Sequence, residues 1–161
     1  EGISSISLRY FNVVGAGGAG LGDNARDNLV PKTFAALRAK KAPEIYGDDY
    51  STRDGTCIRD YIHVVDLAES HLMALKALDT QSMAQAFNVG SGSGYTVKEV
   101  MAQIKKSSEI EFTPNLLERR AGDPESLVAN IDAIKEKLGW QPRFSLKEMI
   151  DSAWQAEVAR T

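Results

Sequence analysis

The sequence has few of the residues that mark metal centres, disulfide scaffolds and membrane proteins. Cys57 is the only cysteine in 161 residues, so an internal disulfide is impossible and a reducing compartment fits best. The two histidines, His63 and His71, belong to no Cys/His cluster with zinc-ligand spacing, and we expect no metal. No apolar run approaches the ~20 residues of a membrane span, and no signal-peptide pattern opens the chain. We therefore expect a cytoplasmic protein with no membrane partner.

An excess of one charge is also missing. The sequence has 19 Lys and Arg residues against 22 Asp and Glu residues, a net charge of −3, and no basic cluster exceeds a few residues. We therefore expect no nucleic-acid partner, because such binding needs a basic face. The composition, 43% hydrophobic and 25% charged, is that of one ordinary globular domain. No repeat, low-complexity segment or linker divides the sequence, so we predict a single domain over residues 1–161.

Local patterns predict strands that alternate with helices, which places the chain in the α/β class. Runs of β-branched, aromatic and other apolar residues predict strands over residues 3–14, 44–47, 57–64, 86–90 and 110–114. Helical spacing and capping residues predict helices over about 29–41 and 66–78, one that opens at Thr96, one that ends near Leu138 and one that opens at Ser145.

Capping residues mark three of the predicted helix starts. Asp66 is a good N-cap residue for the helix whose leucines recur at helical spacing. Thr96 and Glu99 are three residues apart and form a capping box, and Ser145 and Glu148 form another. The leucines of the helix that begins at Asp66 are Leu67, Leu72, Leu75 and Leu78.

Two glycine-rich loops raise the question of a dinucleotide site. The loop over 15–28 has the spacing G-x-G-x-x-G from Gly15 to Gly20, but its third glycine opens no helix and no ribose-binding acid follows ~20 residues later. The loop over 90–94 has the spacing G-x-G-x-G between a strand and a capped helix. We interpret the first as a flexible surface loop and the second as a tight turn, which needs the same glycines.

Several longer motifs, taken in order, carry a family resemblance. They are LRYFNVVGA (8–16), DNLVP (27–31), IYGDDYSTRDGTCIRDYIHVVDLAESH (45–71) and RRAGDPESLVA (119–129), supported by FNVGSGSGYTVKEV (87–100) and LGWQP (138–142). Together they resemble the carboxy-terminal half of UDP-glucose 4-epimerases, which belong to the extended short-chain dehydrogenase/reductase family. The resemblance covers nearly the whole chain, and DGTCIRDYIHV is its most specific part.

The resemblance implies a fold, a reaction and a missing half. The expected fold is the substrate-binding part of an extended Rossmann-type protein, with strands that complete a cofactor-domain sheet. The family interconverts UDP-glucose and UDP-galactose through a 4-keto intermediate with bound NAD, using a Y-x-x-x-K motif. None of the five tyrosines has a lysine four residues later, and the first residue is not Met. We therefore expect a fragment with no catalytic residue, from a parent that is a homodimer and binds NAD mainly through the absent amino-terminal domain.

Arginines and backbone amides are the groups that bind a diphosphate. The resemblance implies that Arg59 and Arg120 contact the diphosphate of a UDP-sugar or lie beside it, and that backbone N–H groups of Asn28 and Leu29 face the phosphate at a helix start. Without the resemblance, Arg59 is also explained as a structural arginine beside Asp60, and Asn28 as an ordinary N-cap.

The remaining expected contacts follow the other parts of the ligand. The resemblance places Glu44, Ile45 and Tyr46 beside the uracil, although Tyr46 fits equally well as a core aromatic. Asp123 is expected to accept from the ribose hydroxyls, with a Gly-Asp-Pro turn as the alternative. Two further substrate contacts are expected at Asn12, which is alternatively a turn-capping residue, and at Leu127.

The leucine at position 127 also leaves open whether N-acetylated substrates are accepted. The family position that it occupies helps decide whether an N-acetyl group fits, and leucine is neither of the familiar residues there. UDP-glucose and UDP-galactose are the expected substrates. Tyr10 and Phe11 match family positions near the nicotinamide of NAD. The alternatives are another nucleotide-sugar enzyme, such as a dehydratase, a decarboxylase or an N-acetylhexosamine epimerase, and a non-catalytic UDP-sugar-binding module.

Overall fold

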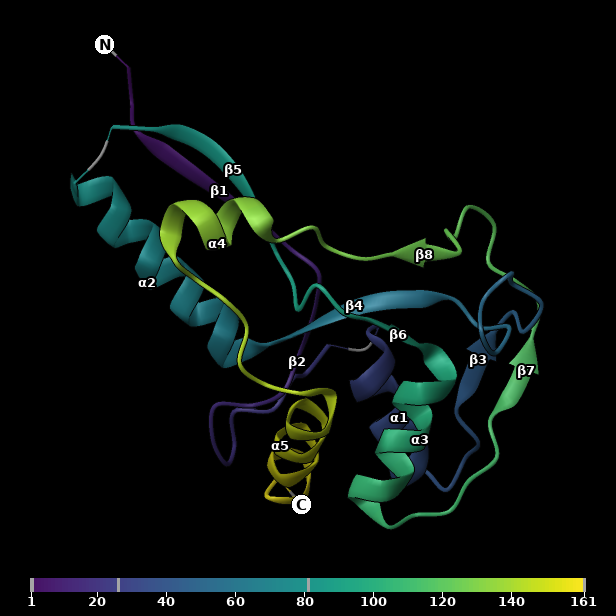
Figure 1. The fold of residues 1–161 in the computed structure, drawn as a ribbon. Helices are drawn as coiled ribbons and strands as arrows, with labels where there is room; N and C mark the ends of the chain where they lie inside the picture. The colour runs from purple at the N-terminus through teal and green to yellow at the C-terminus, as the bar shows by residue number, and fades with distance from the viewer. Residues whose placement is uncertain (1, 26, 81, 161) are drawn as a thin grey trace.

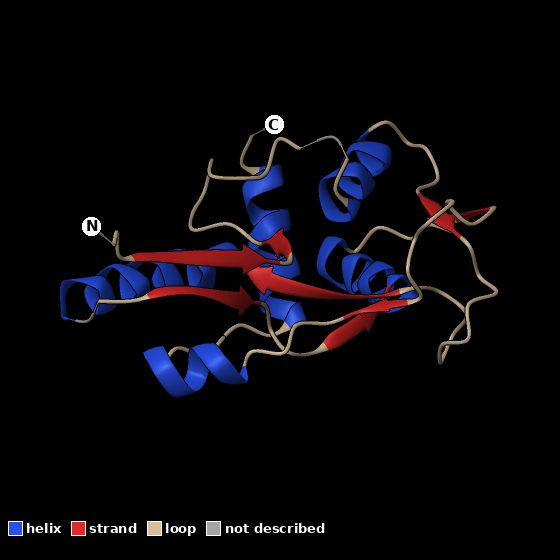
Figure 2. Ribbon diagram, turned by 90° about the horizontal axis from the view of Figure 1, so that it is seen from above, coloured by secondary structure: helices blue, strands red, loops and turns tan. Residues whose placement is uncertain are grey.

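The computed structural model describes residues 2–25, 27–80 and 82–160 and confirms the α/β class (Figure 1). Three groups of strands lie along the molecule, with the β1–β5 pair at one end, the β3–β7 pair at the other and β4 between them (Figures 1 and 2). The strands are β1 (Ser5–Tyr10), β2 (Asn12–Val14), β3 (Glu44–Tyr46), β4 (Ile58–His63), β5 (Ala84–Val89), β6 (Gly94–Thr96), β7 (Asn115–Leu117) and β8 (Ser126–Leu127).

Most strand pairs are parallel. β1 pairs with β5, β2 with β4 and β3 with β7 in parallel register, and β8 runs parallel to β4, whereas β6 is antiparallel to β4. Helices connect the strands: α1 (Leu29–Arg38), α2 (Val64–Thr80), α3 (Val97–Ser108), α4 (Asp132–Leu138) and α5 (Leu146–Val158). Because parallel strands end on the same side, the carboxyl ends of β2 and β4 come together, and His63 at the end of β4 bonds to Ser152 of α5.

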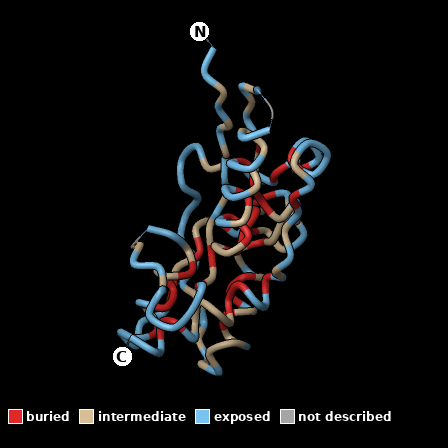
Figure 3. The backbone as a smooth tube through the Cα atoms, turned by 90° about the vertical axis from the view of Figure 1, so that its left-hand side faces the viewer, coloured by how far each residue is buried: buried red, intermediate tan, exposed pale blue. Residues whose placement is uncertain are grey.

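Two hydrophobic clusters hold these elements, and the buried segments lie in the middle of the molecule (Figure 3). The first joins α1, α3 and α5, and its members include Val30, Phe34, Val100, Ile104, Met149 and Ile150. The second lies between β1, β5, α2 and α4, and its members include Ile62, Leu67, Phe87, Val89, Ile134 and Trp140. Burial of each large side chain contributes about 1.5–3 kcal/mol.

The structure divides the predicted strand over residues 3–14 into two. β1 ends at Tyr10 and β2 begins at Asn12, and the two strands have different partners, β5 and β4. Phe11 lies at the change of partner, where its N–H still bonds to the carbonyl of Val89 (3.2 Å). A continuous β-rich pattern cannot show such a change, because the partners lie far along the chain.

Two further expectations were wrong in position. The strand predicted over residues 110–114 is irregular, and β7 begins only after Pro114, because proline has no N–H to donate to a neighbouring strand. Asp66 is not an N-cap: α2 begins at Val64, and Asp66 lies in its first turn. The N–H of Val65 instead bonds to Nδ1 of His63 (3.1 Å). Leu72 and Leu75 of the same helix are each 59% exposed.

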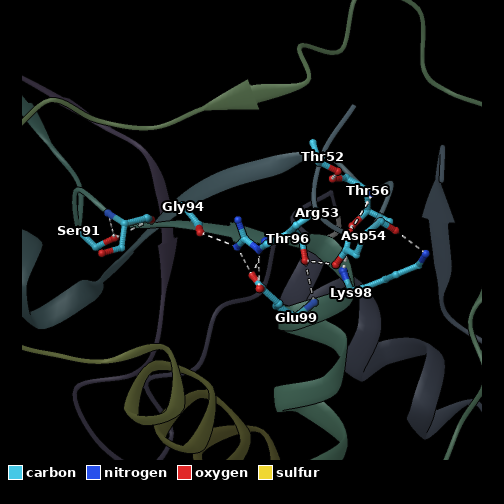
Figure 4. A network of polar contacts seen from close by, with 10 residues as sticks. Thr52, Arg53, Asp54, Thr56, Ser91, Gly94, Thr96, Lys98 and Glu99 are labelled. Carbon is cyan, nitrogen blue, oxygen red and sulfur yellow. Dashed lines mark hydrogen bonds and ion pairs between the residues drawn. The ribbon is translucent and has the colours of Figure 1, made fainter. Parts of the chain in front are cut away.

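The capping boxes are confirmed. Thr96 is the N-cap of α3 and Ser145 is the N-cap of α5. In both, the side chain accepts from the N–H three residues later, while the glutamate there accepts in return. Thr96 also donates to Oδ2 of Asp54 (2.5 Å), which ties α3 to the loop after β3 (Figure 4). Across the described residues, no helix combines the length and apolar character needed to cross a bilayer.

Candidate functional site

A cavity of about 190 Å³ opens where β2, β4 and the start of α1 meet. Eight of the ten predicted substrate-binding residues line it, although they come from five separate segments of the chain. These residues are Asn12, Asn28, Leu29, Glu44, Tyr46, Arg59, Arg120 and Asp123. Within the described ranges, no group of three or more His, Cys, Asp and Glu side chains is arranged to hold a metal.

The amino-terminal end of α1 forms one wall. Asn28 occupies the N-cap position with extended backbone (φ −76°, ψ 146°), yet its side chain makes no capping bond. Its amide lies 3.4 Å from Asp23 Oδ2 instead. The N–H groups of Leu29 and Val30 have no hydrogen bond to any described residue, and the first turn carries no acidic residue. Free N–H groups at the positive end of the helix dipole suit an anion.

Arg59 and Asp123 form the second wall as an ion pair. The Arg59 side chain is only 13% exposed, and its guanidinium bonds both to the Asp123 carboxylate and to its neighbour's carbonyl, that of Ile58 (2.7 Å). Arg59 is thus held in one position at the cavity, while Asp123 already satisfies part of its charge. The interpretation of Arg59 as structural and its interpretation as a ligand-binding residue are both compatible with this contact.

Asn12 is oriented by the backbone of β4. Its side-chain Nδ2 donates to the carbonyl of Asp60 (3.1 Å), which leaves its Oδ1 without a partner among the described residues. The contact runs across the parallel pair of β2 and β4, where Asn12 is in register with Tyr61. Asn12 therefore presents an acceptor at the cavity, and it does not cap a turn.

A charged cluster lies at the rim formed by β3 and α1. Lys32 Nζ (3.0 Å) and the Tyr46 hydroxyl (2.8 Å) both donate to Oε2 of Glu44. The bonds from Tyr46 and then Lys32 hold the pKa of Glu44 below its usual value, and the bond to Glu44 raises the pKa of Lys32. The guanidinium carbon of Arg120 lies 3.8 Å from the Tyr46 ring centroid, so one face of this ring is covered by a cation.

Several lining residues were not predicted from the sequence, and Lys32, Cys57 and Tyr61 are among them. Lys32 follows Asn28 by four residues, so helical spacing alone would have placed it on the same side of α1. Burial raises the pKa of the Cys57 thiol and that of the Tyr61 hydroxyl, which keeps both groups protonated near neutral pH. The cavity therefore combines fixed cations, the first N–H groups of α1 and a few acceptors, which equips it to bind a polar anion.

The remaining predicted contacts lie elsewhere. Ile45 is buried and its side chain does not line the cavity, whereas Leu127 in β8 is 50% exposed. Tyr10, at the end of β1, is exposed, with its ring 6.2 Å from that of His71. Phe11 packs against the second hydrophobic cluster. The structure does not bring these four residues to the cavity, and their roles stay predictions.

Described residues of both glycine loops make close contacts within the chain. In the 90–94 loop, the N–H groups of Ser91 (2.7 Å) and Gly92 (3.0 Å) donate to the carboxylate of Asp60, so they are not available to a pyrophosphate. In the other loop, Gly15 lies against the ring of His63, where a Cβ would come within 2.5 Å. The hydrogen bonds to Asp60 support a tight turn at 90–94. The contact with His63 shows that glycine at position 15 allows close packing.

Comparison with known proteins agrees with this geometry. A protein family described as GDP-mannose 4,6 dehydratase matches residues 1–153. The chain belongs to this family. Within the GDP-mannose 4,6-dehydratase family, it is similar to a curated relative named UDP-glucose 4-epimerase from Rhizobium meliloti, with 42% identity over 158 residues that cover 96% of this chain and 48% of the relative.

Solved structures of the same kind share the fold. UDP-glucose 4-epimerase from Stenotrophomonas maltophila, with bound NAD and formylated UDP-arabinopyranose, matches with a TM-score of 0.92 and 32% identity over 98% of this chain and 48% of that one. The enzyme from Bifidobacterium longum, in complex with NAD+ and UDP, has a TM-score of 0.85 and 33% identity over 96% and 48%. The resemblance to the carboxy-terminal half of these epimerases is thereby confirmed, and the chain spans about half the length of the relatives it matches.

Proposed function

We propose that this chain is the sugar-nucleotide-binding half of a UDP-glucose 4-epimerase. The observation that carries the proposal is the cavity, in which the N-terminus of α1, Arg59 and Arg120 border one space with the acceptors Asn12 and Asp123. Two arginines and two backbone N–H groups suit a diphosphate, and carboxylate and amide oxygens suit the hydroxyls of ribose and hexose. Residues 1–161 act as one domain in this proposal.

The proposal divides the epimerase reaction between this chain and the rest of a full-length protein. NAD is present in the similar solved structures and supplies redox chemistry when bound, whereas in this chain the N–H groups of Ser91 and Gly92 already donate to Asp60. We propose that NAD is held mainly by the half that this chain does not span, with Tyr10 and Phe11 beside the nicotinamide. The chain by itself then binds the ligand weakly and has no epimerase activity.

The same proposal covers substrate, assembly and location. The substrates are UDP-glucose and UDP-galactose, with Leu127 as the residue to vary when N-acetylated UDP-hexoses are tested. The full-length protein is cytoplasmic and homodimeric, and it has no nucleic-acid partner. Conversion of UDP-glucose by that protein distinguishes the proposal from a dehydratase or decarboxylase, because only an epimerase returns UDP-galactose with no loss of water or carbon dioxide.

Calorimetric titration of the chain with UDP, UDP-glucose and UDP-galactose tests the binding half of the proposal. Arg59→Ala and Arg120→Ala should each weaken binding about tenfold or more, because each removes a charge-assisted contact. Arg38→Ala is the matched control: Arg38 is ion-paired with Glu157 outside the cavity, and Glu157 keeps a second partner in Arg160. Equal affinities for all four proteins would reject the site.

A folded chain that binds none of the three ligands calls for the same titration on a full-length protein with NAD. Binding that appears only there, and that Arg59→Ala weakens, would show that the site needs both halves. Absence of binding in that protein as well would reject the proposed function.

A further inference from the structure

Asp60 is a fully buried carboxylate that joins three segments of the chain. It is 0% exposed, lies in β4 next to Arg59, and accepts four hydrogen bonds. Its Oδ1 accepts from the N–H and the hydroxyl of Ser91, both at 2.7 Å. Its Oδ2 accepts from the N–H groups of Gly92 (3.0 Å) and Ala129 (3.1 Å). A charged group out of contact with water is stabilised by several such donors.

The space around this carboxylate is closed. A Cβ on Gly90 would lie 2.6 Å from Asp60 Oδ2 and 2.6 Å from the Cβ of Ala129. The 90–94 loop and the segment that ends at Ala129 are thus pressed together over Asp60, with no room for a longer side chain. The backbone carbonyl of Asp60 also accepts a hydrogen bond from the side-chain amide of Asn12. Both the backbone and the side chain of Asp60 therefore hold neighbouring segments.

The segment that Asp60 holds carries Asp123. Its residues from Glu125 to Val128 are exposed, and β8 within it is only two residues long, paired to β4 at Ile58 and Arg59. At its other end, Arg119 and Arg120 fasten the segment to Asp49 and Tyr46. The bond from Ala129 to Asp60 is therefore the buried attachment at the carboxyl end of a segment that otherwise lies on the surface.

We propose that Asp60 is a positioning residue for the sugar-nucleotide site: it holds the segment over 123–129 against β4 so that Asp123 stays within reach of Arg59. The ligand in this inference rests on the proposed function, whereas the placement of the 123–129 segment by Asp60 does not. Asp60 does not line the cavity and acts through Asp123, Arg59 and Asn12. Asparagine in its place keeps the shape but turns one acceptor into a donor, which cannot pair with the N–H groups it would meet.

Asp60→Asn and Asp66→Asn form a matched pair of variants. Both aspartates are 0% exposed, and Asp66 likewise accepts backbone N–H groups, those of Arg143 (2.9 Å) and Phe144 (3.2 Å), away from the cavity. Hydrogen exchange, measured in the 161-residue chain and corrected for global stability, should rise about tenfold or more at Ala129 and across 123–128 in Asp60→Asn. Asp66→Asn should leave this segment unchanged and accelerate exchange near residue 144.

Titration with UDP separates the positioning role from general stability. Asp60→Asn should weaken UDP binding by about tenfold at a temperature where it is fully folded, whereas Asp66→Asn should bind as the unmodified chain does. A double-mutant cycle combines Asp60→Asn with Arg59→Ala. The fold-loss of UDP affinity in the double variant should be smaller than the product of the fold-losses in the two single variants, because both substitutions act on one contact.

Each failure has its own meaning. Unchanged exchange over 123–129 in Asp60→Asn would overturn the inference, and so would a UDP affinity equal to that of Asp66→Asn when Arg59→Ala weakens binding. If Arg59→Ala has no effect on UDP while exchange over 123–129 rises, the proposed ligand is wrong and the positioning by Asp60 stands. Ser91→Ala, which removes one donor and no backbone, replaces Asp60→Asn if that variant does not fold, with exchange at Ala129 about threefold faster.

Discussion

Gly15 lies against the imidazole ring of His63, and the contact joins the loop after β2 to the end of β4. Gly15 has φ +94°, and a Cβ there would lie 2.5 Å from both Cδ2 and Nε2 of His63. The ring is buried, stacks on Phe144 and bonds through Nε2 to the hydroxyl of Ser152 (3.0 Å), which also accepts from the N–H of Ala16 (3.2 Å). A buried histidine thus fastens the loop that borders the cavity to α5.

Gly15→Ala should destabilise the chain by about 2–4 kcal/mol, because alanine adds a steric clash to an unfavourable backbone conformation. Gly20→Ala is the control: Gly20 also has a positive φ (+78°), but a Cβ there meets nothing within 4 Å. Its cost should be about 1 kcal/mol, from backbone strain alone. Urea unfolding of the two variants measures the difference, and equal losses would show that the contact with His63 is unimportant.

His63 should make the stability of the chain depend on pH. Burial lowers its pKa below the usual 6.5, with the charges of Asp66 and Glu148 opposing the shift. Its Nδ1 accepts the N–H of Val65, which also requires the neutral ring. A lowered pKa means that the unfolded chain binds the proton first. The stability contributed by neutral His63 is therefore complete above about pH 6.5 and is lost as pH falls below it, with a slope of at most about 1.4 kcal/mol per pH unit.

Urea unfolding between pH 7.5 and 5.5 checks this slope. His63→Gln should be less stable at pH 7.5 but should lose less stability on acidification than the unmodified chain. The exposed His71 provides the control, and His71→Gln should keep the slope of the unmodified chain. A slope in His63→Gln as steep as that of the unmodified chain would assign the pH dependence to other groups.

The two capping boxes should differ in their contribution to stability. Ser145 is exposed, and Ser145→Ala should cost about 1 kcal/mol, the usual cost of losing an N-cap. Thr96 is fully buried and also donates to Asp54 (2.5 Å), so Thr96→Ala loses the cap and leaves a carboxylate without one donor (Figure 4). Its cost should be about 2–4 kcal/mol. Thr96→Ser, which keeps the hydroxyl, should recover most of the stability that Thr96→Ala loses. Thermal unfolding measures the variants, and a larger loss of stability in Ser145→Ala than in Thr96→Ala would contradict the prediction.

Local features of the fold were predictable, and long-range ones were not. Both capping boxes follow from residues three apart, so the sequence alone is sufficient to place the starts of α3 and α5. The division at Phe11 depends on β4 and β5, and the start of α2 depends on His63, which caps it from the preceding strand. A pattern in one segment carries no information about partners contributed by another.

In the candidate site too, some features were predictable from the sequence and others were not. The motifs that resemble the epimerases contain Arg59, Arg120 and Asn28, and the structure brings them to one cavity. Helical spacing from Asn28 could have placed Lys32 on the site side of α1, but its bond to Glu44, twelve residues away on another element, could not be foreseen. The tight surroundings of Asp60 were also invisible, since its four donors come from two loops whose approach only the folded chain reveals.

The ion pair of Arg59 and Asp123 predicts opposite effects on two ligands. The Asp123 carboxylate offsets the charge that Arg59 would offer to a phosphate. Asp123→Asn removes this competition, so pyrophosphate should bind about threefold more tightly. UDP gains the same advantage but loses an acceptor for its ribose, so the ratio of UDP affinity to pyrophosphate affinity should fall. Asp49→Asn removes an equal charge from an ion pair with Arg119 outside the cavity and should leave that ratio unchanged. Pyrophosphate binding that weakens in Asp123→Asn would mean that the carboxylate supports the orientation of Arg59 more than it competes for its charge.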